Sequence, residues 1–155
     1  HKEVLEIEPL IEECVLSVRE SLLNNGAKFT SRIADNLPAV HADRRALKQI
    51  ILNLLSNSAK FTPGDGHIDV RVDVTNGAHI ICVTDTGTGI PAHKLDTLTD
   101  PFVRSESNPY KSQQGTGLGL AIVKALTEWH NGALHLQSEV GKGTTVTITL
   151  PMDVA

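Results

Sequence analysis

The sequence predicts an α/β sandwich, a fold in which helices pack against one side of a β-sheet. Three segments repeat apolar residues with the spacing of amphipathic helices, and shorter segments between them alternate apolar and polar residues as strands do. Two pairs of these strands follow each other directly, as in antiparallel hairpins. Consecutive hairpins fit a sandwich better than a doubly wound parallel sheet, whose strands alternate with helices.

The first half of the chain contains two of the predicted helices. Residues 4–8 alternate like a short edge strand, and a helical pattern then extends over residues 9–25 and stops at a glycine. Residues 27–33 alternate again and predict a second strand. Asp43 is a residue type that caps helix N-termini, so a long helix is predicted from there to about Phe61.

The second half combines hairpins with a long loop and one more helix. Asn76 and Gly77 lie between two alternating segments and form a strong hairpin signal. Residues 85–117 lack periodicity, and a loop of this length in a compact domain is typically functional or disordered. The remaining elements are predicted as strands over 67–74 and 78–84, a helix over 118–130, and strands over 132–138 and 143–150.

The composition excludes some classes of function. With 155 residues, 40% of them apolar, the chain fits one domain with a substantial core. A formal net charge of -4 argues against nucleic acid as a partner, because phosphate-backbone binding depends on Lys and Arg. Cys14 and Cys82 show no metal-ligand spacing and no disulfide framework, which suits a reducing compartment. Neither an apolar run near the roughly 20 residues of a membrane span nor a signal peptide is visible, so a cytoplasmic location is expected.

Three polar residues form a narrow stripe beside the apolar face of the second predicted helix. They are Asn53, Asn57 and Lys60, which lie about one helical turn apart. Carboxamide oxygens suit Mg²⁺, which keeps several of its waters, and an ammonium suits a phosphate chain. A site for a cation and a phosphate is one interpretation, and a polar helix flank without a role is the other.

Asp85 follows directly on a predicted strand and precedes Gly87 and Gly89. A carboxylate at a strand end can accept a hydrogen bond from an exocyclic amine such as that of adenine. The glycines let the backbone approach a flat base closely. Taken alone, this motif is better interpreted as a tight turn with a capping aspartate.

Two more glycine-rich segments lie in the C-terminal part. Gly115, Gly117 and Gly119 lead into a predicted helix, and backbone N–H groups at a helix N-terminus can bind phosphate. A flexible hinge is the alternative interpretation, and neither the dinucleotide-binding pattern G-x-G-x-x-G nor a Walker A motif is present. Residues 141–145 read GKGTT, which taken alone is an ordinary hairpin turn.

Taken together and in this order, the four segments resemble the boxes of the catalytic and ATP-binding domain of sensor histidine kinases, within the GHKL ATPase superfamily. The N box reads DRRALKQIILNLLSNSAKFT, and the glycine boxes read DTGTGI, GTGLGLAIVKAL and GKGTTVTITLP. The segment DPFVRSES is similar to the F box of the ATP lid. The resemblance covers nearly the whole chain. It implies a Bergerat-type sandwich of a mixed five-stranded sheet and three helices, with a mobile ATP lid over about residues 91–114.

The resemblance also implies a role for each matching residue. Asn57 binds Mg²⁺ with help from Asn53, Lys60 contacts phosphate, and Asp85 accepts from the adenine amino group. The other implied nucleotide-binding residues are Gly87 and Gly89 beside the adenine, Gly115, Thr116, Gly117, Leu118 and Gly119 around the phosphates, Phe102 as the lid anchor, Arg104 and Lys111 as phosphate contacts, and Thr144 near the adenine.

Three positions depart from the family pattern. Ser58 stands where relatives usually have Ala, a small change expected to have no effect on binding. Leu98 occupies the place of the first F-box aromatic, and Val103 replaces a common Tyr. Both are expected to affect how the lid is anchored and closed.

The function implied is Mg-ATP binding and donation of the γ-phosphoryl group to a histidine on a separate dimerisation domain, in two-component signalling with a response regulator. None of the seven histidines lies in the family's acceptor motif, and all except His1 are expected at the surface or in turns. The phosphoacceptor domain is therefore expected outside this sequence, with no catalytic residue here and a monomeric domain that binds ATP or ADP. Anchoring of the full-length protein at the inner face of the cell membrane stays open. The alternatives are a pseudokinase-like regulatory module and another GHKL ATPase, such as gyrase B, a MutL-type repair protein or an anti-sigma serine kinase.

Overall fold

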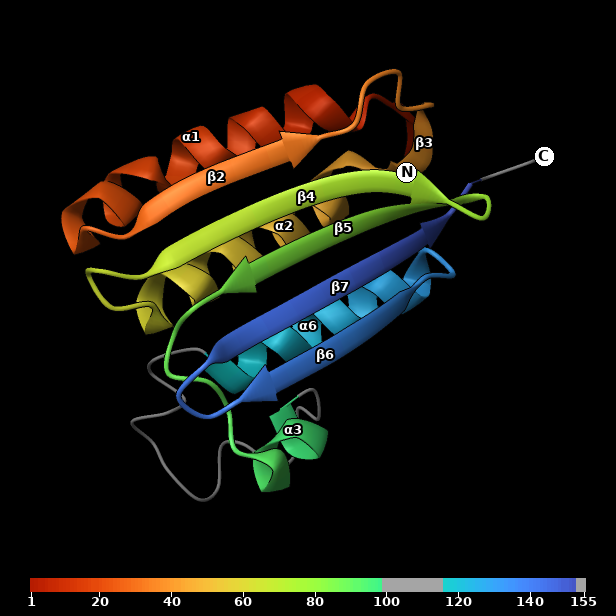
Figure 1. Cartoon of the computed structure of the whole chain (residues 1–155). Helices are drawn as coiled ribbons and strands as arrows, with labels where there is room; N and C mark the ends of the chain where they lie inside the picture. Colours follow the sequence, from red (N-terminus) through yellow and green to blue (C-terminus); the bar gives the residue numbers. More distant parts are fainter. Residues whose placement is uncertain (99–115, 153–155) are drawn as a thin grey trace.

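The computed structural model describes residues 1–98 and 116–152, except for the side chains of residues 21–25, 96–98 and 116–118. Figure 1 shows the helices and strands of the chain. In order they are β1 (Lys2–Leu5), α1 (Ile7–Asn25), β2 (Lys28–Ile33), β3 (Val40–Asp43), α2 (Arg44–Phe61), β4 (His67–Thr75), β5 (Ala78–Asp85), α3 (Ala92–Leu98), α6 (Thr116–Trp129), β6 (Ala133–Glu139) and β7 (Gly143–Pro151).

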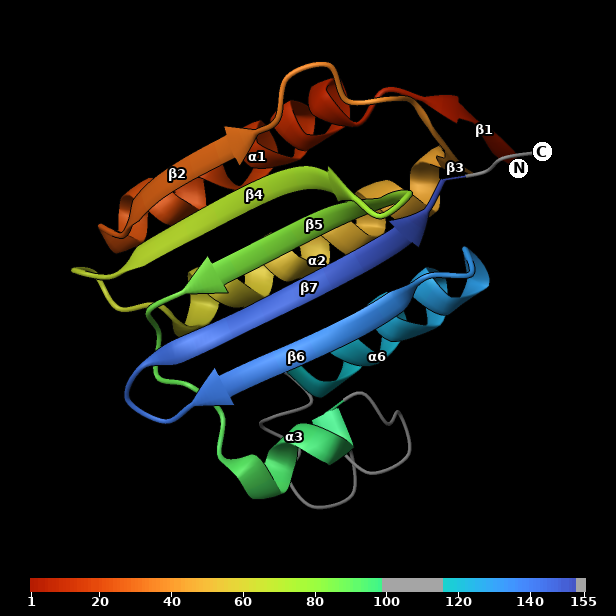
Figure 2. The ribbon, with the colours of Figure 1, turned by 45° about the vertical axis from the view of Figure 1, so that its right-hand side comes forward.

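Five strands form the main sheet in the order β2-β4-β5-β7-β6. β2 runs parallel to β4, and the other neighbouring pairs are antiparallel. The helices α1, α2 and α6 lie against one face of this sheet (Figures 1 and 2). β1 and β3 form a separate two-stranded sheet at one end. The predicted sandwich of a mixed five-stranded sheet and three helices is confirmed.

The core lies between the sheet and these three helices. Side chains on the inner face of the strands are buried, as at Val70, Ile81 and Ile148, while their neighbours along each strand are more exposed. The core contains few aromatic residues, because only 3% of the chain is aromatic. The largest fully buried side chains are all Leu or Ile: Ile7, Leu10, Ile11, Leu47, Ile50, Ile51, Leu54, Leu55, Ile68, Ile81 and Ile148.

Several predicted boundaries are wrong. The strand expected over 4–8 ends at Leu5, and α1 already begins at Ile7. Leu5 and Ile7 are both buried, and apolar residues two apart look like a strand, although Pro9 is well tolerated in the first turn of a helix. β3 was missed because it has four residues, and α3 was missed because seven residues give too little periodicity. α6 begins at Thr116, two residues before the predicted start.

The predicted cap of α2 is confirmed, and it is joined to an unexpected buried histidine. The Asp43 side chain accepts a 3.0 Å hydrogen bond from the backbone N–H of Ala46. The Asp43 backbone N–H donates to Nε2 of His130 at 3.0 Å, so Nδ1 carries the ring proton and donates to the carbonyl of Leu126 at 2.8 Å. His130 and His79 were expected at the surface but are 6% and 0% exposed. His130 therefore fastens the C-terminal end of α6 to the start of α2.

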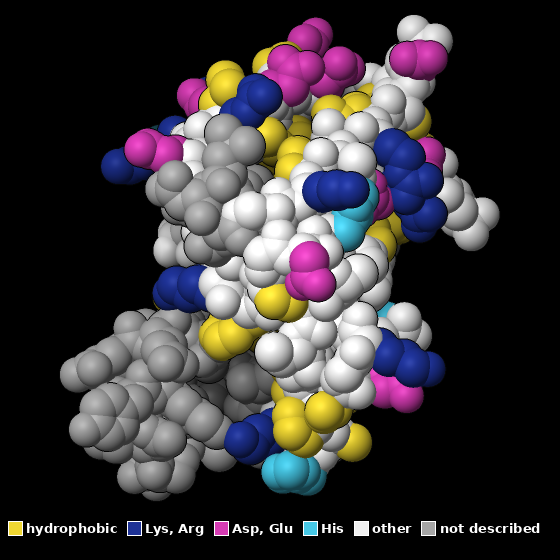
Figure 3. All heavy atoms as spheres, turned by 60° about the vertical axis from the view of Figure 1, so that its left-hand side comes forward, with side chains coloured by type: hydrophobic (Ala, Val, Ile, Leu, Met, Phe, Trp, Pro, Cys, Tyr) yellow, Lys and Arg dark blue, Asp and Glu magenta, His cyan; other side chains and the backbone are white. Residues whose placement is uncertain are grey.

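On the face shown in Figure 3, the basic and acidic side chains that the structure describes are interspersed, and none of that face is continuously basic. Within residues 1–98 and 116–152, no helix has both the length and the apolar character to span a membrane.

Replacing His130 with Phe should lower the free energy of unfolding by about 1–3 kcal/mol, because a half-buried backbone N–H loses its acceptor. Urea unfolding of the intact domain measures the change. The matched control is His135→Phe, at an exposed position of β6, which should change stability by no more than about 0.5 kcal/mol. Equal stability of the two variants would contradict the bridging role of His130.

Candidate functional site

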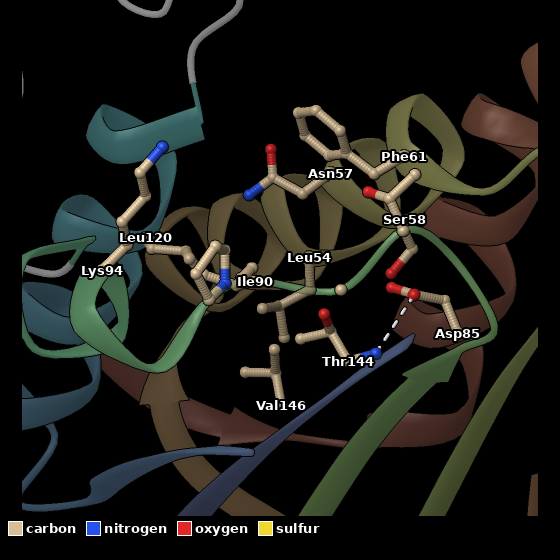
Figure 4. Close-up of a pocket in the computed structure, with 13 residues that line it drawn as sticks. Leu54, Asn57, Ser58, Phe61, Asp85, Ile90, Lys94, Leu120, Thr144 and Val146 are labelled. Carbon is tan, nitrogen blue, oxygen red and sulfur yellow. Dashed lines mark hydrogen bonds between the residues drawn. The ribbon is translucent and has the colours of Figure 1, made fainter. Parts of the chain in front are cut away.

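A cavity of about 220 Å³ lies beside the end of β5, between α2, α3, α6 and β7 (Figure 4). The loop that follows β5 forms another of its walls. The residues that line it are Leu54, Asn57, Ser58, Phe61, Asp85, Thr88, Gly89, Ile90, Pro91, Lys94, Leu120, Thr144 and Val146. The cavity therefore combines residues from all four motifs of the sequence, with Leu120 contributed by the segment GTGLGL.

One face of α2 provides the floor of the cavity. Leu54, Asn57, Ser58 and Phe61 follow one another at helical spacing, so they lie on the same side of the helix. The N-terminal part of this face packs in the core, and its last two turns line the cavity. The amide nitrogen of Asn57 is buried and has no hydrogen-bond partner among the described residues. Such an unpaired donor is costly unless a ligand or water occupies it.

Asp85 places a carboxylate in the interior of the site, because the residue is only 8% exposed. Its Oδ1 accepts hydrogen bonds from the backbone N–H groups of Gly87 at 2.8 Å and of Thr144 at 3.3 Å. Burial raises the pKa of Asp85, and the hydrogen bonds from Gly87, the Ser58 hydroxyl and Thr144 oppose this shift. The carboxylate is held in place as an acceptor but is poorly solvated.

The loop after β5 is tied on both sides, which fixes the wall of the cavity. The backbone N–H of Thr88 donates to the carbonyl of Phe61 at 3.2 Å, and the Thr88 carbonyl accepts from Gly141 at 2.9 Å. The backbone N–H of Ile90 donates to Oγ of Ser138 at 2.7 Å, and this hydroxyl lies 2.8 Å from Oγ1 of Thr144. The loop is thereby clamped between the end of α2 and the β6–β7 turn.

Two glycines are required by this close packing. A Cβ added to Gly87 would overlap the carbonyl of Phe61, and one added to Gly89 would overlap the carbonyl of Glu139. Gly89 also has a φ of 76°, in the region that disfavours other residues. The glycines of DTGTGI therefore allow the loop to lie against α2 and the β6–β7 turn.

The structure brings four of the predicted residues to the cavity: Asn57, Asp85, Gly89 and Thr144. Gly87 does not line the cavity, but its backbone N–H donates a hydrogen bond to Asp85. Gly119 lies beside Asn57, where an added Cβ would come within 3.2 Å of the amide nitrogen.

Other predicted residues lie away from the wall or outside the described part. Asn53 is half-buried and Lys60 is exposed, and neither lines the cavity. Thr116, Gly117 and Leu118 form the start of α6, without described side chains. Phe102, Arg104, Lys111 and Gly115 lie outside the described residues.

Sequence reasoning missed Ser58 and Lys94. Ser58 was expected to have no effect, yet it is 6% exposed, lines the cavity and donates to Asp85. Its position four residues after Leu54 was the signal that could have placed it there. Lys94 belongs to α3, a helix too short to show periodicity, so no signal pointed to it.

Substituting Gly89 by Ala should destabilise the domain, and Gly77→Ala gives a matched control. Both glycines have a φ near 75°, but nothing lies within 4 Å of a Cβ at Gly77. Gly77→Ala measures the backbone strain alone, about 1–2 kcal/mol. Overlap with Glu139 should add about 1–3 kcal/mol at Gly89. Equal losses in urea unfolding would show that the loop is not clamped as described.

Replacing Asp85 with Asn should leave the ligand-free domain at least as stable as the wild type at neutral pH. The folded-state pKa of Asp85 is raised above its unfolded-state value. The contribution of Asp85 to the free energy of unfolding is therefore fully present at pH values below its unfolded-state pKa, and it is lost as the pH rises through its folded-state pKa. The wild type should therefore lose stability relative to Asp85→Asn as the pH rises over that range. Urea unfolding at several pH values tests this, with Asp65→Asn, at an exposed turn, as control. A wild type that gains relative stability with pH would contradict the raised pKa.

Comparisons with known proteins agree with the site. Residues 42–154 match the family described as histidine kinase-, DNA gyrase B-, and HSP90-like ATPase. The chain is 44% identical over 154 residues to the non-motile and phage-resistance protein of Caulobacter vibrioides, covering 97% of this chain and 18% of that protein. It is 44% identical over 116 residues to the histidine protein kinase DivJ of the same species, covering 75% and 19%. Full-length ShkA in complex with AMPPNP has a TM-score of 0.84 at 27% identity, covering 99% of this chain and 32% of that chain.

The chain spans less than a fifth of the length of these two relatives, so the likeness concerns one domain. The matched residues include α2, the loop after β5, α6 and β7, which build the cavity. The chain therefore belongs to the family of histidine kinase-, DNA gyrase B- and HSP90-like ATPases, and within it is the ATP-binding catalytic domain of a sensor histidine kinase.

Proposed function

We propose that this domain binds Mg-ATP in the cavity beside Asp85 and donates the γ-phosphoryl group to a histidine on a separate dimerisation domain. The observation that carries the proposal is the pairing of a buried carboxylate with an apolar cavity that also holds the amide of Asn57, whose nitrogen has no partner in the part of the chain that the structure describes. A nucleotide has matching parts, namely a flat base with an exocyclic amine and a charged phosphate chain.

The adenine is recognised at the Asp85 end. The carboxylate accepts from the exocyclic amine, while Leu54, Ile90 and Val146 supply apolar surface for the faces of the ring. Guanine carries a carbonyl oxygen at the equivalent position, and two acceptors facing each other in a buried site repel. A cavity of about 220 Å³ is smaller than the roughly 300–1,000 Å³ of sites that hold a whole drug-sized ligand. It accommodates the base, and the phosphates extend toward Asn57 and the start of α6.

The residues around Asn57 fit a magnesium ion and a phosphate. Mg²⁺ keeps several waters and is usually held by one or two protein oxygens plus the phosphates, so one carboxamide oxygen is an adequate protein ligand. The amide nitrogen of Asn57, which has no hydrogen-bond partner within residues 1–98 and 116–152, fits a phosphate oxygen, and Gly119 leaves that space open. When bound, the metal neutralises charge on the transferred group. Asn53 assists from one turn earlier, and Lys60 contacts phosphate.

The segment over about 91–114 is proposed as the ATP lid, with Phe102 as its anchor and Arg104 and Lys111 as phosphate contacts. The glycines of GTGLGL flank the phosphates and hinge this lid. Catalysis in such a domain is mostly positioning and charge neutralisation. We assign no phosphoacceptor to this chain. The histidine, the dimer contacts and the response regulator belong to the full-length kinase, which works on the cytoplasmic side where ATP is supplied.

A calorimetric titration of ATP with and without Mg²⁺ tests the binding part of the proposal. Asn57→Ala should weaken Mg-ATP binding by about 10- to 100-fold, because a charge-assisted contact is lost. The control is Gln49→Ala, an exposed carboxamide on the same helix, which should bind like the wild type. Wild-type protein that binds no ATP would favour the pseudokinase-like alternative.

Phosphotransfer is tested by adding a histidine kinase dimerisation domain to this domain and radiolabelled ATP. The label should appear on the added histidine and not on the catalytic domain alone. Robust labelling of the isolated domain, or labelling of serine in a protein substrate, would refute transfer to a separate histidine.

A further inference from the structure

Lys94 is a basic residue that the structure places on the cavity wall and that no family motif assigned. It lies on α3, and Figure 4 shows it at the opposite end of the cavity from Asp85. Its side chain extends beside Leu120 and toward the start of α6. In the same view Asn57 lies between Lys94 and Asp85, and Gly119 lies beside Asn57.

The cavity is therefore polarised along its length. One end carries a buried carboxylate, the opposite end carries an ammonium, and the surfaces between them are largely apolar, with Leu54, Ile90 and Val146. A nucleoside polyphosphate has the complementary polarity, with amine donors on the base and negative charge on the phosphates. The reverse orientation would place phosphate against Asp85, which costs several kcal/mol by like-charge repulsion.

The backbone that carries Lys94 is held in place by its neighbours. The backbone N–H of Ile90 donates to the Ser138 hydroxyl, and the ring of Pro91 fixes the φ of Pro91 itself. The backbone N–H of Lys94 donates to the Pro91 carbonyl at 2.9 Å, which closes the first turn of α3. α3 itself packs against α6 and β6. Lys94 thus projects from a wall that is tied through Ile90 and Ser138 to Thr144, whose backbone N–H donates to Asp85.

We propose that Lys94 binds a phosphate oxygen of the bound nucleotide and so selects nucleoside polyphosphates over nucleosides. This inference rests on the proposed function, since it names a further contact in the same site. It assigns part of the phosphate recognition to α3, in addition to α2 and the start of α6. A lysine suits this task because its compact charge accepts several phosphate geometries.

The test compares Lys94→Met and Lys94→Arg with the wild type in titrations of ATP, ADP and adenosine. Met keeps a long apolar stem and removes only the charge, and Arg restores the charge. Lys94→Met should weaken ATP and ADP binding about 10-fold, as expected for one charged hydrogen bond, and leave adenosine binding unchanged. Lys94→Arg should recover most of the loss. Lys124→Met, at an exposed position of α6 away from the cavity, should match the wild type.

The outcomes separate this inference from the proposed function. Wild-type protein that binds neither ATP nor adenosine would overturn both. If the wild type binds ATP and Lys94→Met binds ATP, ADP and adenosine each as tightly as the wild type does, only the role of Lys94 is refuted. An equal loss for ATP and adenosine would mean that Lys94 supports the fold of the wall, and this also refutes phosphate recognition. Urea unfolding of each variant confirms that the compared proteins are folded.

Discussion

The burial of the Asp85 carboxylate is the constraint on which the rest of the site depends. A charge taken out of water is tolerated only where donors replace the lost solvation. Here the donors come from three places: Gly87 in the loop, Thr144 at the start of β7 and Ser58 on α2. To bring them together, the loop must pass close to α2 and to the β6–β7 turn. The close packing that brings hydrogen-bond donors to Asp85 therefore requires glycine at positions 87 and 89.

Binding function and stability oppose each other at this site. Burial raises the pKa of Asp85, and the amide nitrogen of Asn57 has no partner among the described residues. Both features lower the stability of the ligand-free domain, because charged and polar groups are withdrawn from water. A nucleotide that supplies an amine to one and a phosphate oxygen to the other would satisfy both groups. Ligand binding would then stabilise the fold by mass action.

Much of the fold could be predicted because its elements are long and regular. The 18-residue α2, with its Asp43 cap, and the Asn76-Gly77 hairpin carry strong local signals. β3 and α3 were missed because short elements depend on tertiary contacts that the sequence does not display. In the site, Asn57, Asp85, Gly89 and Thr144 were predicted from motifs, whereas Lys94 depends on how α3 packs. Helical spacing predicted that Asn53 and Lys60 share one stripe of α2 with Asn57, but it could not show that they lie away from the cavity wall. The contact of Ser58 with Asp85 depends on how α2 packs against the end of β5, which the sequence does not display.

The central claim is that the Asp85 carboxylate recognises the exocyclic amine of adenine. The most direct test is a double-mutant cycle that compares ATP with purine riboside triphosphate, which lacks this amine, on the wild type and on Asp85→Asn. The wild type should bind ATP about 10- to 100-fold more tightly than the analogue, since removing the amine leaves a buried acceptor unpaired. Asp85→Asn should lose this preference. A preference of the same size in Asp85→Asn would contradict the account.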